Sequence, residues 1–134
     1  MARIRGNNSN NSIVGTNFAD EIFAFSGNDR VTAGNGNDIV WGGGGTDTLF
    51  GGNDNDRLFG ESGLDTLVGD AGNDTLEGGS GADRHFGNAG IDWVSYCLLY
   101  TSLASVKAFT KALSWLSSAR TAGGETASSR HARM

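Results

Sequence analysis

Residues 49–60 read LFGGNDNDRLFG, and this stretch decides the fold. Two aspartates, Asp54 and Asp56, stand among glycine and asparagine, with short apolar pairs on either side. Such a stretch is too polar for a buried strand, and its glycines disfavour a helix. Its meaning therefore depends on how the surrounding sequence uses it.

The same pattern returns every nine residues along most of the chain. From Gly6 to Ser95, ten units of nine residues follow one another without an insertion. The eighth place is apolar in every unit but one, where His85 stands, and the sixth place is aspartate in every unit but the first, which has Asn11. A register held over this length is typical of a repeat architecture, in which each unit is one structural element.

Each place in the unit has a physical reason. Places one to six are rich in glycine, which supplies the positive φ angles that tight turns need. Places seven to nine suit a three-residue strand, whose central side chain points to the opposite face from its neighbours. Two units of nine residues would form one coil with a strand on each side. We therefore predict an all-β solenoid with two parallel sheets and a thin apolar interior.

Stacked coils would also align the sixth-place aspartates in two columns. Like charges about 5 Å apart repel by roughly 3 kcal/mol at an effective dielectric constant near 20. A divalent cation between successive coils would reverse that sign, and Ca²⁺ accepts carboxylate and backbone carbonyl oxygens together. We therefore predict calcium sites along both columns. The first contains Asp20, Asp38, Asp56, Asp74 and Asp92, and the second contains Asp29, Asp47, Asp65 and Asp83, with Asn11 at its end.

The units resemble the RTX, or hemolysin-type, calcium-binding nonapeptide repeat, whose pattern is G-G-x-G-x-D-x-U-x. Residues 42–50, GGGGTDTLF, match every defined place, and residues 78–86, GGSGADRHF, match all but the apolar one. The resemblance covers residues 6–95. It implies a parallel β-roll and Ca²⁺ held by the sixth-place aspartates and by loop carbonyls. It also implies export from a bacterium by type I secretion, and folding that calcium triggers outside the cell.

Composition argues against several other classes of protein. Residues 6–95 carry 14 acidic side chains against three arginines, in a chain of net charge −5. Cys97 is the only cysteine, so neither an intrachain disulfide nor a cysteine-based zinc site can form. No apolar run approaches the roughly 18 residues of a membrane span, and no catalytic motif is present. We expect no nucleic-acid partner, no membrane span and no catalysis by this chain.

Two groups of side chains stand outside the repeat pattern. Asp54, Glu61 and Asp70 are extra acids in the loops, which could add metal ligands but which we interpret as solvated. The ninth place often holds an aromatic residue that faces away from the interior. These residues either form docking faces for another domain or a second copy, or simply reflect the preference of aromatics for strands. They are Phe23, Trp41, Phe50, Phe59 and Phe86.

Both ends of the chain depart from the repeat. Residues 1–5 hold Ile4 in phase with the eighth-place column, as expected of a truncated first unit. Residues 96–134 carry a charge of +4, and their apolar spacing predicts a capping helix over 103–119, followed by a flexible segment. Residues 97–102, CLLYTS, also resemble the translation of an adapter used in sequencing libraries. Residues 97–134 are therefore either a native tail or non-native sequence.

The repeat leaves the wider function open between two interpretations. The first is a secreted RTX module that binds calcium and folds on it. The alternative is a C-terminal fragment of a larger secreted RTX protein. That protein would be a protease, lipase or polysaccharide-modifying enzyme, or a toxin or adhesin. Sequence upstream of Met1 would distinguish them, because an H-E-x-x-H stretch favours a protease and further repeats favour a toxin or adhesin.

Overall fold

A computed structural model gives the fold and describes residues 1–96. These residues form short strands, and none of their segments is a helix long and apolar enough to cross a membrane. The helix predicted over 103–119 lies outside the described residues. The strands are β1 (Arg3–Arg5), β2 (Ser12–Val14), β3 (Glu21–Phe23), β4 (Arg30–Gly34), β5 (Ile39–Gly44), β6 (Thr48–Asn53), β7 (Arg57–Ser62), β8 (Thr66–Ala71), β9 (Thr75–Glu77), β10 (Arg84–Ala89) and β11 (Trp93–Ser95).

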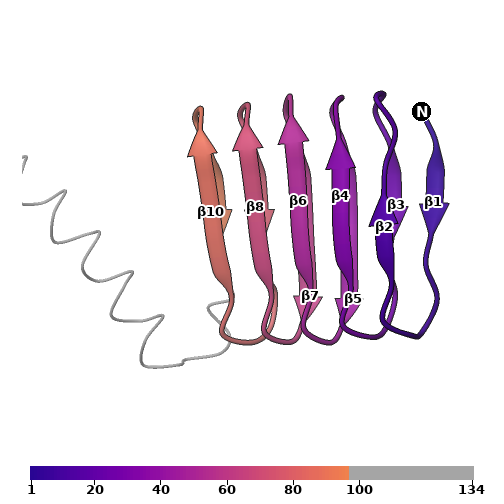
Figure 1. Cartoon of the computed structure of the whole chain (residues 1–134). Coiled ribbons are helices and arrows are strands. Elements are labelled where there is room, and N and C mark those ends of the chain that lie inside the picture. Colours follow the sequence, from indigo (N-terminus) through magenta and orange to yellow (C-terminus); the bar gives the residue numbers. More distant parts are fainter. Residues whose placement is uncertain (97–134) are drawn as a thin grey trace, which may run out of the picture. The chain divides into compact units, whose positions relative to one another are not determined.

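The strands form two sheets in which every pairing is parallel (Figure 1). Odd-numbered strands form a six-stranded sheet in the order β1-β3-β5-β7-β9-β11, and even-numbered strands form a five-stranded sheet. Paired residues lie two units apart, as Val40 opposite Leu58 and Val31 opposite Leu49 show. One coil therefore contains two nine-residue units and gives one strand to each sheet. This arrangement confirms the predicted all-β parallel β-roll.

The interior is a double row of apolar side chains from the eighth place of each unit. Eight of these are buried, and Ile4 and Val94 pack against the ends of the row. Each buried side chain of this size contributes about 1.5–3 kcal/mol to folding. The stabilisation from apolar burial is therefore distributed along the whole stack of coils. The buried eighth-place residues are Ile13, Ile22, Val31, Val40, Leu49, Leu58, Leu67 and Leu76.

The strands are longer than the sequence predicted. Six of them continue past the ninth place into the next unit, so that β5 ends at Gly44 rather than at Trp41. Because side chains alternate along a strand, the first place of the next unit also faces inward. Ala24 and Ala33, both at first places, are accordingly part of the core with no exposed surface. The interior thus has a second inward-facing place, which the sequence prediction of a single apolar column missed.

The first strand lies ahead of the first whole unit. β1 pairs with β3, and Ile4 lies opposite Ile22 in the same register as every later pair. Residues 3–5 therefore add one more strand to the six-stranded sheet, beyond the ten units counted from the sequence.

Candidate metal centre

The sixth-place aspartates lie at the bends that precede the strands, and most are buried. Asp38 and Asp47 have no exposed surface, and Asp20, Asp29, Asp56, Asp65 and Asp74 expose 2% or less. Asp83 and Asp92 belong to the last coil and are half-buried. Burying an ionised carboxylate without compensation is strongly unfavourable, so each of these groups needs partners.

One oxygen of each carboxylate ties successive coils together. The backbone N–H of Asp38 donates to Oδ1 of Asp56 at 2.8 Å, and the backbone N–H of Asp56 donates to Oδ1 of Asp74 at 2.9 Å. The two predicted columns are therefore present, with each aspartate directly above the next. The remaining links at 2.8–2.9 Å join Asp20 to Asp38, Asp29 to Asp47, Asp47 to Asp65, Asp65 to Asp83 and Asp74 to Asp92.

The second oxygen of most of these carboxylates has no protein partner. Among residues 1–96, Oδ2 is buried without a hydrogen-bond partner in six aspartates. Such atoms are rare in folded proteins, because an unsatisfied buried acceptor costs about 1–3 kcal/mol, and more when it is charged. A row of them in equivalent places indicates a shared missing partner. The six are Asp29, Asp38, Asp47, Asp56, Asp65 and Asp74.

In most units, glycine at the first place lies directly against this oxygen. A Cβ atom added to Gly42 would lie 2.6 Å from Oδ2 of Asp47, and one added to Gly60 would lie 2.5 Å from Oδ2 of Asp65. A side chain at Gly42 or Gly60 would therefore crowd the carboxylate. Alanine nonetheless occupies the same place in two units, at Ala24 and Ala33. In the units with glycine here, the surface beside Oδ2 is bare backbone.

Burial and mutual repulsion hold these carboxylates in an unfavourable electrostatic state. Burial, reinforced by Asp38, Asp74 and Asp54, raises the pKa of Asp56 to about 8 against the downward effect of its hydrogen bond. Burial likewise raises the pKa of Asp65 to about 7 and that of Asp38 and Asp47 to about 6. The raised pKa values show that, without a cation, the middle of each column opposes full ionisation.

The unpartnered carboxylate oxygens fit a calcium ion in their chemistry. Ca²⁺ takes six to eight oxygen ligands and binds carboxylates and carbonyls in flexible geometry. Among residues 1–96, no three His, Cys, Asp or Glu side chains converge on one point. An ion beside these carboxylates would therefore need further oxygen ligands, which backbone carbonyls of the glycine-rich loops can offer.

Asp20 differs from the other members of its column. Its Oδ2 accepts hydrogen bonds from the backbone N–H of Thr16 at 2.7 Å and from the Thr16 hydroxyl at 2.8 Å. Burial acts to raise the pKa of Asp20, but these bonds and one from the Ala2 N–H outweigh it and leave the pKa below its usual value. Asp20 already has the partners that the six other carboxylates lack.

A second ladder of hydrogen bonds, which the sequence did not predict, runs along the fifth place of the units. The backbone N–H of Asn73 donates to the Asn55 side chain at 2.8 Å, and the N–H of Asn55 donates to the Asn37 side chain at 2.9 Å. Asn28 bonds to Asn10 in the same way at 2.8 Å. The signal was the frequent asparagine one place before the aspartate. These bonds hold successive loops in register beside the carboxylates.

The extra loop acids are not members of the columns, although their charges help to raise the pKa of neighbouring column aspartates. Asp54 accepts a hydrogen bond from the Gly36 N–H at 3.0 Å, and Asp70 accepts one from the Asn88 amide at 3.2 Å. The aromatics divide between the two sheets rather than forming one stripe. Phe23, Trp41 and Phe59 lie on β3, β5 and β7, whereas Phe50 and Phe86 lie on β6 and β10.

Comparison with known protein families identifies a match to one family model. A family model described as RTX calcium-binding nonapeptide repeat (4 copies) matches the chain in overlapping segments that together run from residue 5 to residue 94. The segments are 5–40, 23–58, 32–67, 41–76 and 59–94. Searches of curated proteins and of solved structures gave no match.

Proposed function

Because the chain belongs to the family of RTX calcium-binding nonapeptide repeats, we propose that its two aspartate columns bind Ca²⁺ between successive coils. The observation that carries this proposal is the row of six buried Oδ2 atoms without a partner. Asp29, Asp38, Asp47, Asp56, Asp65 and Asp74 supply the main carboxylate ligands. Asp83 and Asp92 close the last gap of each column, and Asp20 acts more as a structural cap than as a ligand.

Calcium in these gaps would stabilise the folded roll itself. The ion supplies positive charge between carboxylates that otherwise repel, and it pairs oxygens that otherwise stay unsatisfied. Neither effect operates in the unfolded chain, where the carboxylates are hydrated and far apart. Binding free energy therefore adds to folding free energy, and we propose that the chain folds as calcium binds.

The test is a calcium titration of the full chain, followed by circular dichroism with magnesium as the control ion. We expect a cooperative gain of β-structure with calcium only, because Mg²⁺ demands a stricter octahedral shell and sheds water reluctantly. Asp56→Asn removes one charge from the middle of a column. It should raise the calcium midpoint on the order of tenfold, whereas Asp70→Asn should leave it within about twofold.

The opposite results would contradict the proposal. A spectrum rich in β-structure in a calcium chelator at pH 7.5, unchanged by calcium, would show that the core alone suffices. Equal calcium midpoints for the Asp56→Asn and Asp70→Asn variants would show that the aspartate columns do not bind calcium.

RTX repeats are typical of secreted proteins, and we propose an extracellular site of action for this chain. Millimolar calcium outside a cell would then keep the roll folded, and low calcium inside would keep it unfolded before export. Membership of a larger RTX enzyme, toxin or adhesin stays a hypothesis that the genomic sequence upstream of Met1 tests.

A further inference from the structure

One dipeptide in the bends of the roll combines two residues that can react with each other. Asn35 is followed directly by Gly36, and no other asparagine of the sequence precedes a glycine. In an Asn–Gly pair the backbone nitrogen of the glycine can attack the side-chain amide of the asparagine, because glycine has no side chain to hinder the ring closure. The pair lies in the bend between β4 and β5, at the third and fourth places of its unit.

The fold requires glycine at residue 36. The φ of Gly36 is 105°, which L side chains rarely adopt, and an added Cβ atom would lie 2.5 Å from the Ala19 nitrogen and 2.6 Å from the Phe18 carbonyl carbon. Where other units have glycine at the fourth place, their third place holds serine, alanine or glycine. Residues 35 and 36 are therefore the one point at which the repeat brings asparagine and glycine together.

Stacking holds the Asn35 side chain from both sides. Its amide nitrogen donates to Oδ1 of Asn17 at 3.2 Å, and its Oδ1 accepts from the amide nitrogen of Asn53 at 2.7 Å. These three asparagines occupy the same third place in successive coils. Ring closure consumes the Asn35 amide, so it must break bonds that tie this residue to the coils before and after it.

The attacking nitrogen is held as well. The backbone N–H of Gly36 donates to Oδ2 of Asp54 in the following coil at 3.0 Å. This nitrogen becomes a nucleophile only when it loses its proton, and the resulting anion would lie beside the Asp54 carboxylate. A like charge at this distance opposes such an ionisation. Asp54 therefore lowers the reactivity of Gly36 in the folded chain.

We propose that the Asn35–Gly36 pair is an intramolecular deamidation site that coil stacking keeps closed, so that the chain is modified there when it is unfolded. In the reaction the Gly36 nitrogen loses its proton and forms a bond to Cγ of Asn35, and the side-chain nitrogen leaves as ammonia. Water then opens the succinimide at either carbonyl, which gives aspartate or isoaspartate. Asn17, Asn53 and Asp54 are the groups that prevent this reaction in the folded roll.

Both products would interfere with stacking. An acid at residue 35 has no amide to donate to Asn17, and its charge adds to that of Asp54 in the following coil. Isoaspartate also lengthens the main chain by one carbon directly after Gly34, which pairs with Gly52 in β6. A chain that has stayed unfolded long enough to react would therefore refold less well.

The experiment measures deamidation of the full chain at pH 7.5 and 37 °C by mass spectrometry, after pepsin digestion at low pH. The chain is incubated in saturating calcium, in calcium with denaturing urea, and in a calcium chelator. Asn53 is the internal reference, because it belongs to the same ladder but precedes Asp54, whose side chain hinders ring closure. In urea we expect Asn35 to react at least about tenfold faster than Asn53. In calcium the Asn35 rate should fall at least roughly tenfold, because reaction then needs local opening of the roll.

The chelator sample separates this site from the proposed folding on calcium. Fast deamidation of Asn35 in chelator would support both proposals. Slow deamidation in chelator with fast deamidation in urea would support the closed site, and would show that the roll folds without calcium.

Asp54→Gly tests the carboxylate, and Asp70→Gly is its matched control. Both aspartates have a positive φ, 79° and 74°, so glycine suits either backbone, but only Asp54 accepts the Gly36 N–H. In calcium, Asp54→Gly should speed deamidation of Asn35 by about threefold or more, and Asp70→Gly should leave it within about twofold. Asp54→Asn keeps an acceptor without the charge and should also speed it. Circular dichroism establishes that each variant is folded during the incubation.

Equal Asn35 rates in calcium and in urea would overturn the proposal, because stacking would then give no protection. An unchanged or slower rate in both folded Asp54 variants would do the same, since the carboxylate would then be neutral or would assist the reaction as a base. Deamidation of Asn53 as fast as that of Asn35 in urea would remove the reason for singling out the Asn–Gly pair.

Discussion

At the scale of the residue, the two carboxylate oxygens of each sixth-place aspartate have different roles. Its Oδ1 accepts a backbone N–H from the previous coil, as in Asp38 to Asp56 at 2.8 Å, and so holds the stack in register. Its Oδ2 stays buried without a protein partner and is available to an ion. Asparagine would keep the first role but lose the charge that the second requires. Asn11, at the end of its column, instead accepts the backbone N–H of Asn7 from its own unit at 2.8 Å.

In most units Oδ2 lies against a first-place glycine, and the close contact at Gly60 leads to a prediction. Gly60→Ala puts a methyl group 2.5 Å from Oδ2 of Asp65 and 2.7 Å from the Gly78 carbonyl. We expect it to destabilise the calcium-loaded roll by about 1–3 kcal/mol, as overpacking does, and to raise the calcium midpoint. Thermal unfolding and the calcium titration measure both effects.

Gly44→Ala is the control for this change, because its added Cβ would find its nearest atom at 3.6 Å, which is an ordinary contact. If the two alanine variants behave alike, steric exclusion beside the carboxylate is not what selects glycine at the first place.

At the scale of the element, the nine-residue unit works because a strand and a bend alternate with fixed spacing. The alternation of side chains sends the eighth place inward and the ninth outward, and the longer strands send the next first place inward as well. The last coil breaks this rule at His85. There the ring occupies the column of Leu67 and has neither nitrogen hydrogen-bonded within residues 1–96.

His85→Leu should therefore stabilise the end of the five-stranded sheet. The change replaces two unsatisfied nitrogens with the side chain that fills this column elsewhere, so we expect a gain of about 1–2 kcal/mol. Chemical denaturation at pH 7.5 in saturating calcium measures it. His85→Gln keeps a polar group of similar size, and a gain of the same size in that variant would argue against restored packing.

The His85 substitution also has a pH signature. Burial lowers the pKa of His85 in the folded chain, although Asp83 opposes this effect. The unfolded chain then binds the proton more readily, so the contribution of His85 to stability is lost as pH falls through 6.5. We expect the difference in stability between His85→Leu and the parent to widen between pH 7.5 and pH 5.5. A constant difference would mean that His85 does not titrate differently on folding.

At the scale of the whole molecule, the parallel stack concentrates negative charge in two lines. Burial is the first cause of the raised pKa values, which reach about 8 at Asp56 and about 7 at Asp65. Neighbouring aspartates reinforce the shift, because each lies above the next at a spacing that the sheets fix. Without metal, ionisation of these buried aspartates at neutral pH therefore opposes folding.

This charge arrangement predicts opposite pH responses with and without calcium. In a chelator, the folded chain binds protons at these aspartates more readily than the unfolded chain does, whose aspartates titrate near 4. The metal-free roll should therefore gain stability as pH falls from 8 to about 5, and lose it as pH rises through 6–8. With calcium the trend should reverse, because binding requires the ionised carboxylates.

Circular dichroism at pH 5 and pH 8, with calcium and with chelator, provides the four measurements needed. β-Structure in chelator at pH 5 but not at pH 8 would support the prediction. A metal-free roll that is more stable at pH 8 would show that the aspartates are not buried together in solution.

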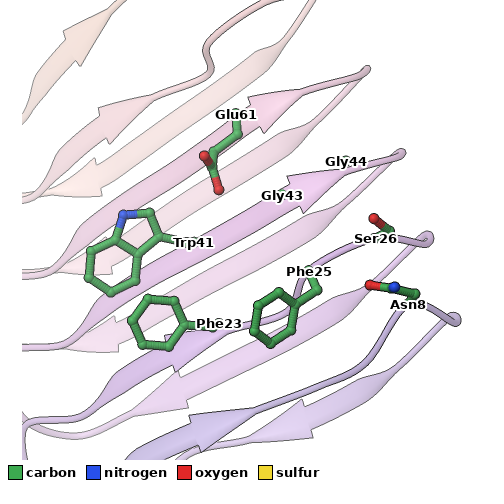
Figure 2. A pocket seen from close by; sticks show the side chains of 8 residues that line it. All are labelled: Asn8, Phe23, Phe25, Ser26, Trp41, Gly43, Gly44 and Glu61. Carbon is green, nitrogen blue, oxygen red and sulfur yellow. The ribbon is translucent and has the colours of Figure 1, made fainter.

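The sequence by itself determined the period, and from the period came the parallel β-roll, the eighth-place core and the two aspartate columns. These follow from local rules, since side-chain alternation and glycine turns act within one unit. Tertiary structure alone decided which carboxylate oxygen is left without a partner, that the first place faces inward, and that the aromatics divide between two sheets. Coil stacking also places Phe25, Gly43 and Glu61 in successive coils of the six-stranded sheet, where they line a groove on its outer face (Figure 2). Contacts between coils depend on which residues stack, and no single unit contains that information.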